Sequence, residues 1–467
     1  GVAFPLNHWR QHDPGTFDVG DIYGGGSPTG VVFYENGSLG EQHDGTFLSC
    51  EAGRNVIFRY QPKMKGATYQ MDRMSFMDSN PDGKFVGSDF VGGRANLPSA
   101  DSEQVDPKLF RPSDVAVGAD GAIYVTDWFD PGVGGHADRD DTCSGTIYRI
   151  APKGFKSSAP KVDLTTIEGA ITALRSPAPN VRWTGFKALK AQGAKALPAV
   201  ERLMADANPW ISVRGIWLLP HLGPKGLAKC QKLTKSKDVK TRMVAYRALK
   251  RSGQDIYELA KTFAADSSPA LRREAALAMR GRAADKAAPV LLEVAKRWDG
   301  ADKNYLESIG LGCENQEPAV WAALRDALAK GDPLKWSDDF AKLTWRLWPS
   351  NAITDLKARA LAKDLTQEQR VFATESIAFI EDPAAAMAML ELAADDSPVK
   401  AEAVRWLLVR GTGSWAKYDI KKGLKEKGIY DPDTIVVNEM KMPPKPKAPK
   451  FSVAEVMKLK GDATRGK

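Results

Sequence analysis

The spacing of apolar side chains changes once along the chain, close to residue 150. Before that point, short runs of four to six residues rich in Val, Ile, Phe and Tyr stand between turn signals. Asn-Gly and Asp-Gly pairs that begin at residues 36, 44, 82 and 120 suit tight hairpin turns. The pattern predicts antiparallel strands at 29–34, 46–49, 55–60, 114–117, 122–126 and 145–150.

Two stretches of this first region resemble each other. Residues 27–60 and 110–150 both run from a strand through a Gly-containing turn to a second strand, and both end in a strand that closes Phe-Arg-Tyr or Tyr-Arg-Ile. Repetition at this length is typical of the blades of a β-propeller. Because two blades cannot close a ring, further blades are expected before residue 1 or from elsewhere.

After residue 150 the apolar residues recur three and four apart, which predicts amphipathic helices. An arginine marks similar segments at residues 182, 214, 242 and 272, and related segments follow near residues 370 and 400. A period of this length predicts helix pairs stacked in a solenoid like that of HEAT repeats. The marker arginines either pair with Asp residues of neighbouring turns or form a basic ladder for an acidic partner; the first interpretation is favoured.

Several segments resemble soluble quinoprotein sugar dehydrogenases. PTGVVFY at 28–34, DGTF at 44–47 and VIFR at 56–59 are similar to their penultimate blade, and FRPSDVAVGADGAIYV at 110–125 is similar to their last blade. DWFDPGVGGH at 127–136 is closer to the haem-binding membrane-bound dehydrogenases of planctomycetes. In that family a propeller precedes HEAT repeats and a C-terminal cytochrome c domain.

The resemblance implies a multidomain protein, with all-β propeller blades over 1–152, an all-α HEAT-like solenoid over 153–412 and a linker over 413–467. The Pro- and Lys-rich composition of 442–450 predicts an extended linker. GDATRGK at 461–467 resembles the lead-in to the cytochrome c domain, so haem c would belong only to that missing domain. The chain would then be a piece of a periplasmic or extracellular dehydrogenase that oxidises a sugar or alcohol and passes electrons to a cytochrome. The alternative is a non-catalytic scaffold whose solenoid binds proteins.

The family holds pyrroloquinoline quinone (PQQ) through basic residues of its last two blades. Arg111 falls on one of these positions, whereas Ser113 and Gly53 stand where the pattern has an arginine and a lysine. Arg54 could replace the missing lysine. Because a trianionic quinone needs several charge-assisted partners, two absent cations weaken the prediction of PQQ.

An acidic, Gly-rich segment follows residue 126 and holds four candidate metal ligands: Asp130, His136, Asp138 and Asp140. Hard oxygen ligands suit calcium. The spacing is not that of an EF-hand, and a solvated acidic loop is the alternative interpretation.

Charge divides the chain in the same place as the apolar pattern. Residues 1–150 carry a net charge of −9 and the remainder +17. This asymmetry is explained either by attraction between the two parts or by an anionic partner.

The Trp-rich helices indicate core packing rather than base stacking, so nucleic acid is not an expected partner. The sequence contains no run of 18 apolar residues, so it predicts no membrane span. Cys50 and Cys143 could form a disulfide or remain buried thiols.

Overall fold

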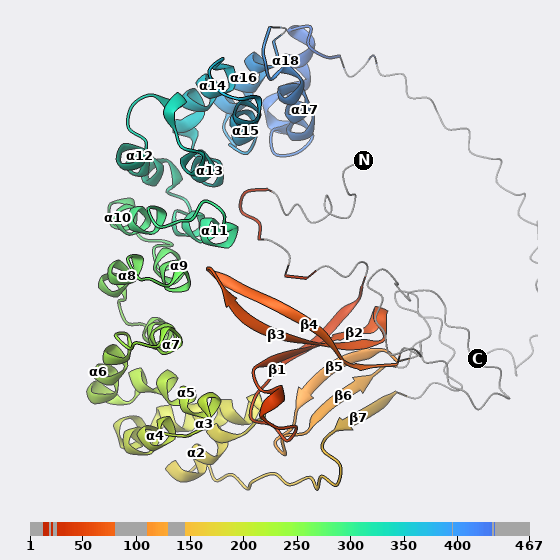
Figure 1. The fold of residues 1–467 in the computed structure, drawn as a ribbon, viewed down its shortest axis with the longest axis vertical. Helices are drawn as coiled ribbons and strands as arrows, with labels where there is room; N and C mark the ends of the chain where they lie inside the picture. Colours follow the sequence, from red (N-terminus) through yellow and green to blue (C-terminus); the bar gives the residue numbers. More distant parts are fainter. Residues whose placement is uncertain are drawn as a thin grey trace, which may run out of the picture.

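The protein is represented by a computed structural model, which describes residues 13–17, 20–21, 26–79, 110–128, 145–394, 396–431 and 434. A part built of two antiparallel sheets comes first, and a long curved array of helices follows it (Figure 1). The sheets lie against the inner side of the curve (Figure 1). Among the described residues, no helix combines the length and apolarity needed to cross a bilayer.

Each sheet is a simple up-and-down meander. The first has the order β1-β2-β3-β4 and the second β5-β6-β7, with every neighbouring pair antiparallel. The bounds are Pro28–Tyr34, Thr46–Glu51, Val56–Lys65 and Thr68–Asp78 for β1 to β4, and Pro112–Val117, Ile123–Asp127 and Thr146–Ile150 for β5 to β7.

The predicted strands are confirmed, and one strand was missed. Each of the six predicted runs overlaps a strand of the structure, and Gly45 and Gly121 adopt the positive φ that their turns require. The missed strand is β4, whose sequence TYQMDRMSFMD contains Thr68 as its single β-branched residue and no Val or Ile. It pairs with an extended β3 along its full length, from Val56 opposite Asp78 to Lys65 opposite Thr68.

One apolar core joins the two sheets. Leu48, Cys50 and Ile57 of the first sheet and Val115 and Ile123 of the second are buried in it. The thiol of Cys50 is free, and burial raises its pKa to about 12. Strand β1 lies beside β5, where the Thr29 hydroxyl donates to the Pro112 carbonyl oxygen at 2.7 Å. The two sheets therefore form one packed unit.

The helices alternate between an outer and an inner layer of the curve (Figure 1). The outer layer contains α2 Ile167–Arg175, α4 Leu197–Met204, α6 Gly223–Leu233, α8 Tyr257–Ala264, α10 Ala284–Ala295, α12 Glu317–Leu328, α14 Ile353–Leu361, α16 Pro383–Leu392 and α18 Ile420–Glu426. The inner layer contains α3 Pro179–Gln192, α5 Pro209–Leu218, α7 Val239–Arg251, α9 Pro269–Leu277, α11 Lys303–Gly312, α13 Asp338–Leu347, α15 Gln367–Ala378 and α17 Lys400–Gly411.

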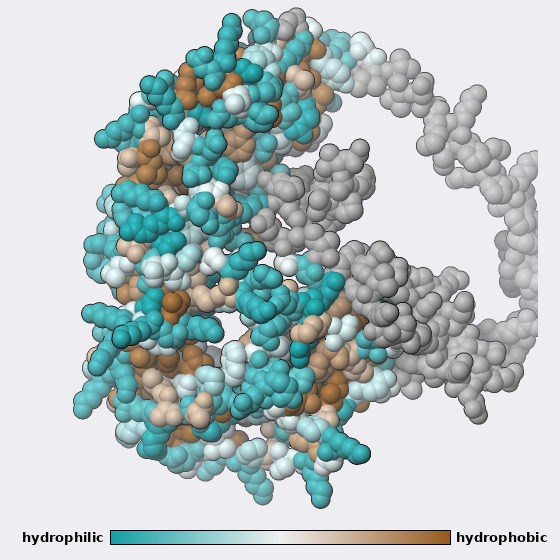
Figure 2. All heavy atoms as spheres, in the orientation of Figure 1, coloured by the Kyte–Doolittle hydropathy of each residue, from teal (hydrophilic) through white to brown (hydrophobic). Residues whose placement is uncertain are grey.

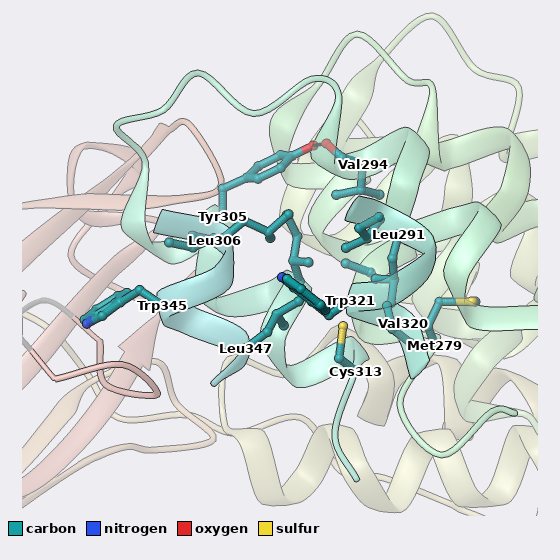
Figure 3. Close-up of a cluster of buried hydrophobic side chains, with 14 of the residues drawn as sticks. Met279, Leu291, Val294, Tyr305, Leu306, Cys313, Val320, Trp321, Trp345 and Leu347 are labelled. Carbon is teal, nitrogen blue, oxygen red and sulfur yellow. Dashed lines mark hydrogen bonds between the residues drawn. The ribbon is translucent and has the colours of Figure 1, made fainter. Parts of the chain in front are cut away.

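Buried apolar side chains run through the array. Trp321 is fully buried among Leu291, Cys313 and Leu347, and its indole N–H donates to the Thr344 hydroxyl at 2.9 Å (Figure 3). Hydrophilic residues cover most of the array in the view of Figure 2, with apolar areas between them. The packing continues past residue 412, because Trp415, Ile420 and Leu424 are buried against the last helices.

The marker arginines bind backbone carbonyl groups. Arg182 and Arg272 donate to carbonyl oxygens in the turns before their own helices, those of Pro177 at 3.0 Å and Asp266 at 2.8 Å. Helix C-termini leave such oxygens without intrahelical partners. Arg242 also forms the predicted ion pair with an Asp of the next turn, Asp266, at 3.0 Å. These arginines therefore hold their own helix pairs together, and Arg242 also joins its pair to the next one.

The tip of the β3–β4 hairpin is anchored in the inner helix layer. Ala67 is fully buried there, and its N–H donates to Asp302 Oδ2 at 2.7 Å. Arg273 on α9 donates to the Ala67 carbonyl oxygen. Gly66 permits the turn with φ of 56°. The far end of the hairpin is thus fixed although its two strands are only partly covered.

Two further contacts attach the first residues and the β1–β2 connection to the helices. The Gly15 N–H donates to Glu307 Oε1 at 3.1 Å. Glu35 accepts ion pairs from Arg182 and Arg214, each at 2.8 Å. The acidic and basic parts of the sequence therefore attract each other directly at Glu35.

Candidate functional site

The two arginines singled out in the sequence lie close together where the sheets meet. The strand ends Glu51, Val56, Pro112 and Asp127 all lie at one end of the β part. Arg54 belongs to the short 3₁₀ turn Ala52–Arg54 between β2 and β3, and Arg111 directly precedes β5. Strand pairing thus brings together residues that are 57 apart in number.

Arg111 is fixed at both its backbone and its side chain. Its N–H donates to Asp127 Oδ1 and its Nη1 donates to the Ala52 carbonyl oxygen, each at 2.8 Å. Only 2% of the residue is exposed. The Asn55 side chain donates to the adjacent Phe110 carbonyl oxygen at 2.6 Å. Arg111 therefore connects the two sheets.

Arg54 is buried as deeply, with 1% of its surface exposed. Glu51, just before it, is fully buried and accepts the Gly53 N–H at 3.0 Å as well as the Ser27 N–H. Asp127 is also buried. Two carboxylates thus accompany two guanidinium groups, an arrangement that lowers the cost of burying each charge.

The remaining positions of the predicted quinone site add no positive charge. Ser113 shares a hydrogen bond of 2.8 Å with the hydroxyl of Thr126 on the paired strand. Gly53 contributes its N–H to Glu51. The structure brings Arg54 and Arg111 together, but in a closed polar cluster with balanced charge.

The predicted metal ligands Asp130, His136, Asp138 and Asp140 lie outside the described residues, as does Cys143. Within the ranges that the structure does describe, no group of three or more His, Cys, Asp or Glu side chains could hold a metal ion. His43, at the other end of the first sheet, has its Nδ1 3.0 Å from Arg59 Nη1. Burial, followed by the charge of Arg59, lowers its pKa.

A second site lies on the inner helix layer beside Glu35. A cleft of about 450 Å³ is lined by residues of α3, α5 and α7; we call it the Trp183 cleft. Its lining consists of Glu35, Leu174, Pro179, Arg182, Trp183, Phe186, Lys190, Arg214, Trp217, His221, Ala248 and Arg251. The cleft combines aromatic faces with an excess of positive charge.

The aromatic wall is well ordered. The rings of Trp183 and Phe186 stack with centroids 5.5 Å apart and planes 12° apart, and the His221 ring meets Phe186 edge-on at 6.0 Å. Trp183 is nevertheless 56% exposed. Arg251 lies over the Trp217 ring with its guanidinium carbon 6.0 Å from the centroid.

The cationic wall is partly buried. Arg214 is 7% exposed and also donates to the carbonyl oxygen of Leu174 at 2.8 Å. Burial lowers its pKa to about 10, against the opposing charge of Glu35. Burial also lowers the pKa of His221, and the charge of Lys190 acts in the same direction.

The sequence predicts that Arg182 and Arg214 pair with Asp residues of neighbouring turns, with a basic ladder for an acidic partner as the alternative, and that Trp183 packs in the core. Trp183 is largely exposed, so that interpretation was wrong for this residue. A signal was present in the segment NVRWTGFKALK, where the aromatic residues 183 and 186 and the basic residues 182 and 190 are spaced to share one side of a helix.

A family model described as a domain of unknown function, DUF7133, matches residues 4–153. The match covers less than half of the chain and ends just after β7. No curated protein is similar enough in sequence to count as a relative. Among solved structures, human deoxyhypusine hydroxylase in complex with glycerol is similar over 53% of this chain and 84% of its own, with 16% identity and a TM-score of 0.18.

Proposed function

We propose that this chain is a non-catalytic scaffold, in which a HEAT-like helical solenoid braced by propeller-like blades presents its surface to protein partners. The observation that carries the proposal is the bracing itself. The hairpin tip is bound by Asp302 and Arg273, the N-terminal segment by Glu307, and the β1–β2 connection by Arg182 and Arg214. Contacts spread along the array would hold its curvature, and a fixed curvature suits recognition of a large partner.

The polar cluster between the sheets supports a structural role. Arg111 uses its side chain to hold a backbone carbonyl of the neighbouring sheet. Glu51 and Asp127 balance the charge of the two arginines. A bound trianionic quinone would add three negative charges to a cluster that already contains two buried carboxylates.

The second candidate is the dehydrogenase module that the family resemblance implies. Its support is the placement of Arg54 and Arg111 together at one end of the blades, where a cofactor held by both residues would have to bind. Under this alternative, the protein would oxidise a sugar or alcohol with PQQ and calcium and pass electrons to a cytochrome.

A titration can overturn the scaffold proposal. The purified chain is mixed with PQQ and Ca²⁺, binding is followed by calorimetry, and reduction of a dye is followed with glucose and with ethanol. The scaffold proposal expects neither binding in the micromolar range nor dye reduction. Stoichiometric PQQ binding that is lost in Arg111→Gln would overturn it and favour the dehydrogenase. The variant Arg149→Gln, on the exposed strand β7, is the matched control.

A further inference from the structure

We propose that the Trp183 cleft binds small aromatic carboxylates. The scaffold proposal uses Glu35, Arg182 and Arg214 of this lining for bracing but does not require the cleft to bind a ligand, so a failure to bind would leave that proposal unaffected. Its volume of about 450 Å³ is within the range of small-molecule sites. The argument rests on the aromatic wall, on the charge of the lining and on one buried donor atom.

The aromatic wall offers a flat apolar surface. Because Trp183 is stacked on Phe186 and still 56% exposed, one side of this pair is held in place while much of its surface meets solvent. Trp217, with Leu174 and Ala248, adds apolar surface to the lining. A planar ring system can cover such a surface and remove it from water, and stacking on an aromatic face adds to the gain.

The charge of the lining favours binding of an anion. Glu35 is the one carboxylate among the lining residues and is shared by Arg182 and Arg214, whereas Lys190 and Arg251 add two further cations. The lining therefore has an excess of three positive charges if His221 is neutral. A ligand with one negative charge would offset part of this excess in a partly desolvated place.

One buried donor in the cleft indicates the kind of anion. Arg214 is more than nine-tenths buried, and its Nε has no hydrogen-bond partner among the described residues. A buried donor without an acceptor destabilises the protein. A carboxylate oxygen would satisfy this N–H once the Arg214 side chain turned it toward the cleft, because the Nε atom itself is buried. A doubly charged phosphate would need more buried donors than the single one identified here.

Calorimetry with the full chain tests the proposal. The probe is 2-naphthoate, and 2-naphthamide is a neutral molecule of the same shape. We expect naphthoate to bind and the amide to bind at least about tenfold more weakly, because the amide lacks the charge. Absence of naphthoate binding up to millimolar concentration, or equal affinity for the amide, would overturn the proposal.

Variants then locate the site. The double variant Lys190→Gln/Arg251→Gln and the single variant Trp183→Ala should each weaken naphthoate binding about tenfold. Lys225→Gln/Lys232→Gln removes the same charge from exposed positions of α6 outside the cleft and should leave the affinity unchanged. Equal losses of naphthoate affinity in both double variants would show a nonspecific effect of charge and contradict the assignment of the site to the Trp183 cleft. Circular dichroism checks that each variant is folded.

An acetylated tripeptide that ends in a phenylalanine carboxylate distinguishes a free small molecule from a protein C-terminus. We expect this peptide to bind no more tightly than naphthoate, since the cleft needs only a ring and one carboxylate. Binding at least tenfold tighter than naphthoate would overturn the small-molecule assignment and make the cleft a site for a peptide terminus.

Discussion

Gly310, in the last turn of α11, leaves room for a buried ion pair. A Cβ atom at this position would overlap the guanidinium group of Arg346. Arg346 pairs with Glu307, and the two side chains are 5% and 1% exposed. Burial raises the pKa of Glu307 although the charge of Arg346 opposes the rise. The absence of a Cβ atom at Gly310 therefore permits the ion pair between Arg346 and Glu307. Glu307 also accepts the Gly15 N–H.

Gly310→Ala should destabilise the protein. Helix propensity alone would predict a gain of about 1 kcal/mol in the free energy of unfolding, so the sign of the measured change separates the two effects. Displacing Arg346 would leave Glu307 buried without its cation, at a cost of roughly 3–5 kcal/mol. Urea unfolding measures the difference. Gly413→Ala, where a Cβ would meet only ordinary contacts at 3.7 and 3.8 Å, is the control and should be tolerated. A stabilised Gly310→Ala protein would show that the ion pair contributes little.

Among the elements, α7 shows how an inner helix begins. Asp238 caps it by accepting the N–H of Thr241 at 2.8 Å and that of Lys240 at 3.4 Å. The hydroxyl of Thr241, followed by these N–H groups, lowers the pKa of Asp238. Because the pKa is lowered, the ionised cap stabilises the protein at pH values above the pKa of this carboxyl group in the unfolded chain. This stability is lost as the pH falls through the pKa that the group has in the folded protein.

Asp238→Ala should therefore cost about 1 kcal/mol at neutral pH, as the loss of a helix cap usually does. The difference from the wild type should shrink below about pH 4, where the wild-type carboxylate begins to take up a proton. Urea midpoints at several pH values provide the measurement. Asp364→Ala changes an exposed Asp between α14 and α15 and should have little effect at any pH. If the loss of stability in Asp238→Ala stayed the same at acidic pH, this result would contradict the assigned role of the carboxylate.

The elements that could be predicted from sequence are those whose signals are local. Alternating apolar runs revealed six strands, and the 30-residue period revealed the paired helices. Strand β4 could not be found this way, because its stability comes from pairing with β3 and from the anchored tip at Ala67. The balance of charge around Arg111 depends on Glu51 and Asp127 from other strands, so the sequence pattern identified the arginine but not its surroundings.

In the whole molecule, three separated contacts hold the β part against the curve of the helices (Figure 1). They reach α3 and α5 through Glu35, α9 and the start of α11 through the hairpin, and α11 again through Gly15. Contacts at several points along the array restrain bending more than one contact could. The proposed scaffold function depends on this restraint.

Hydrogen exchange of the hairpin tip tests the bracing most directly. The measurement follows the peptide that covers residues 64–70 in the unmodified protein by mass spectrometry. If the tip is docked, the Ala67 N–H bound to Asp302 should exchange as slowly as the paired amides of β3 and β4. Exchange of that amide at the rate of a free turn would contradict the account, because the β part would then be held near the helices without being braced against them.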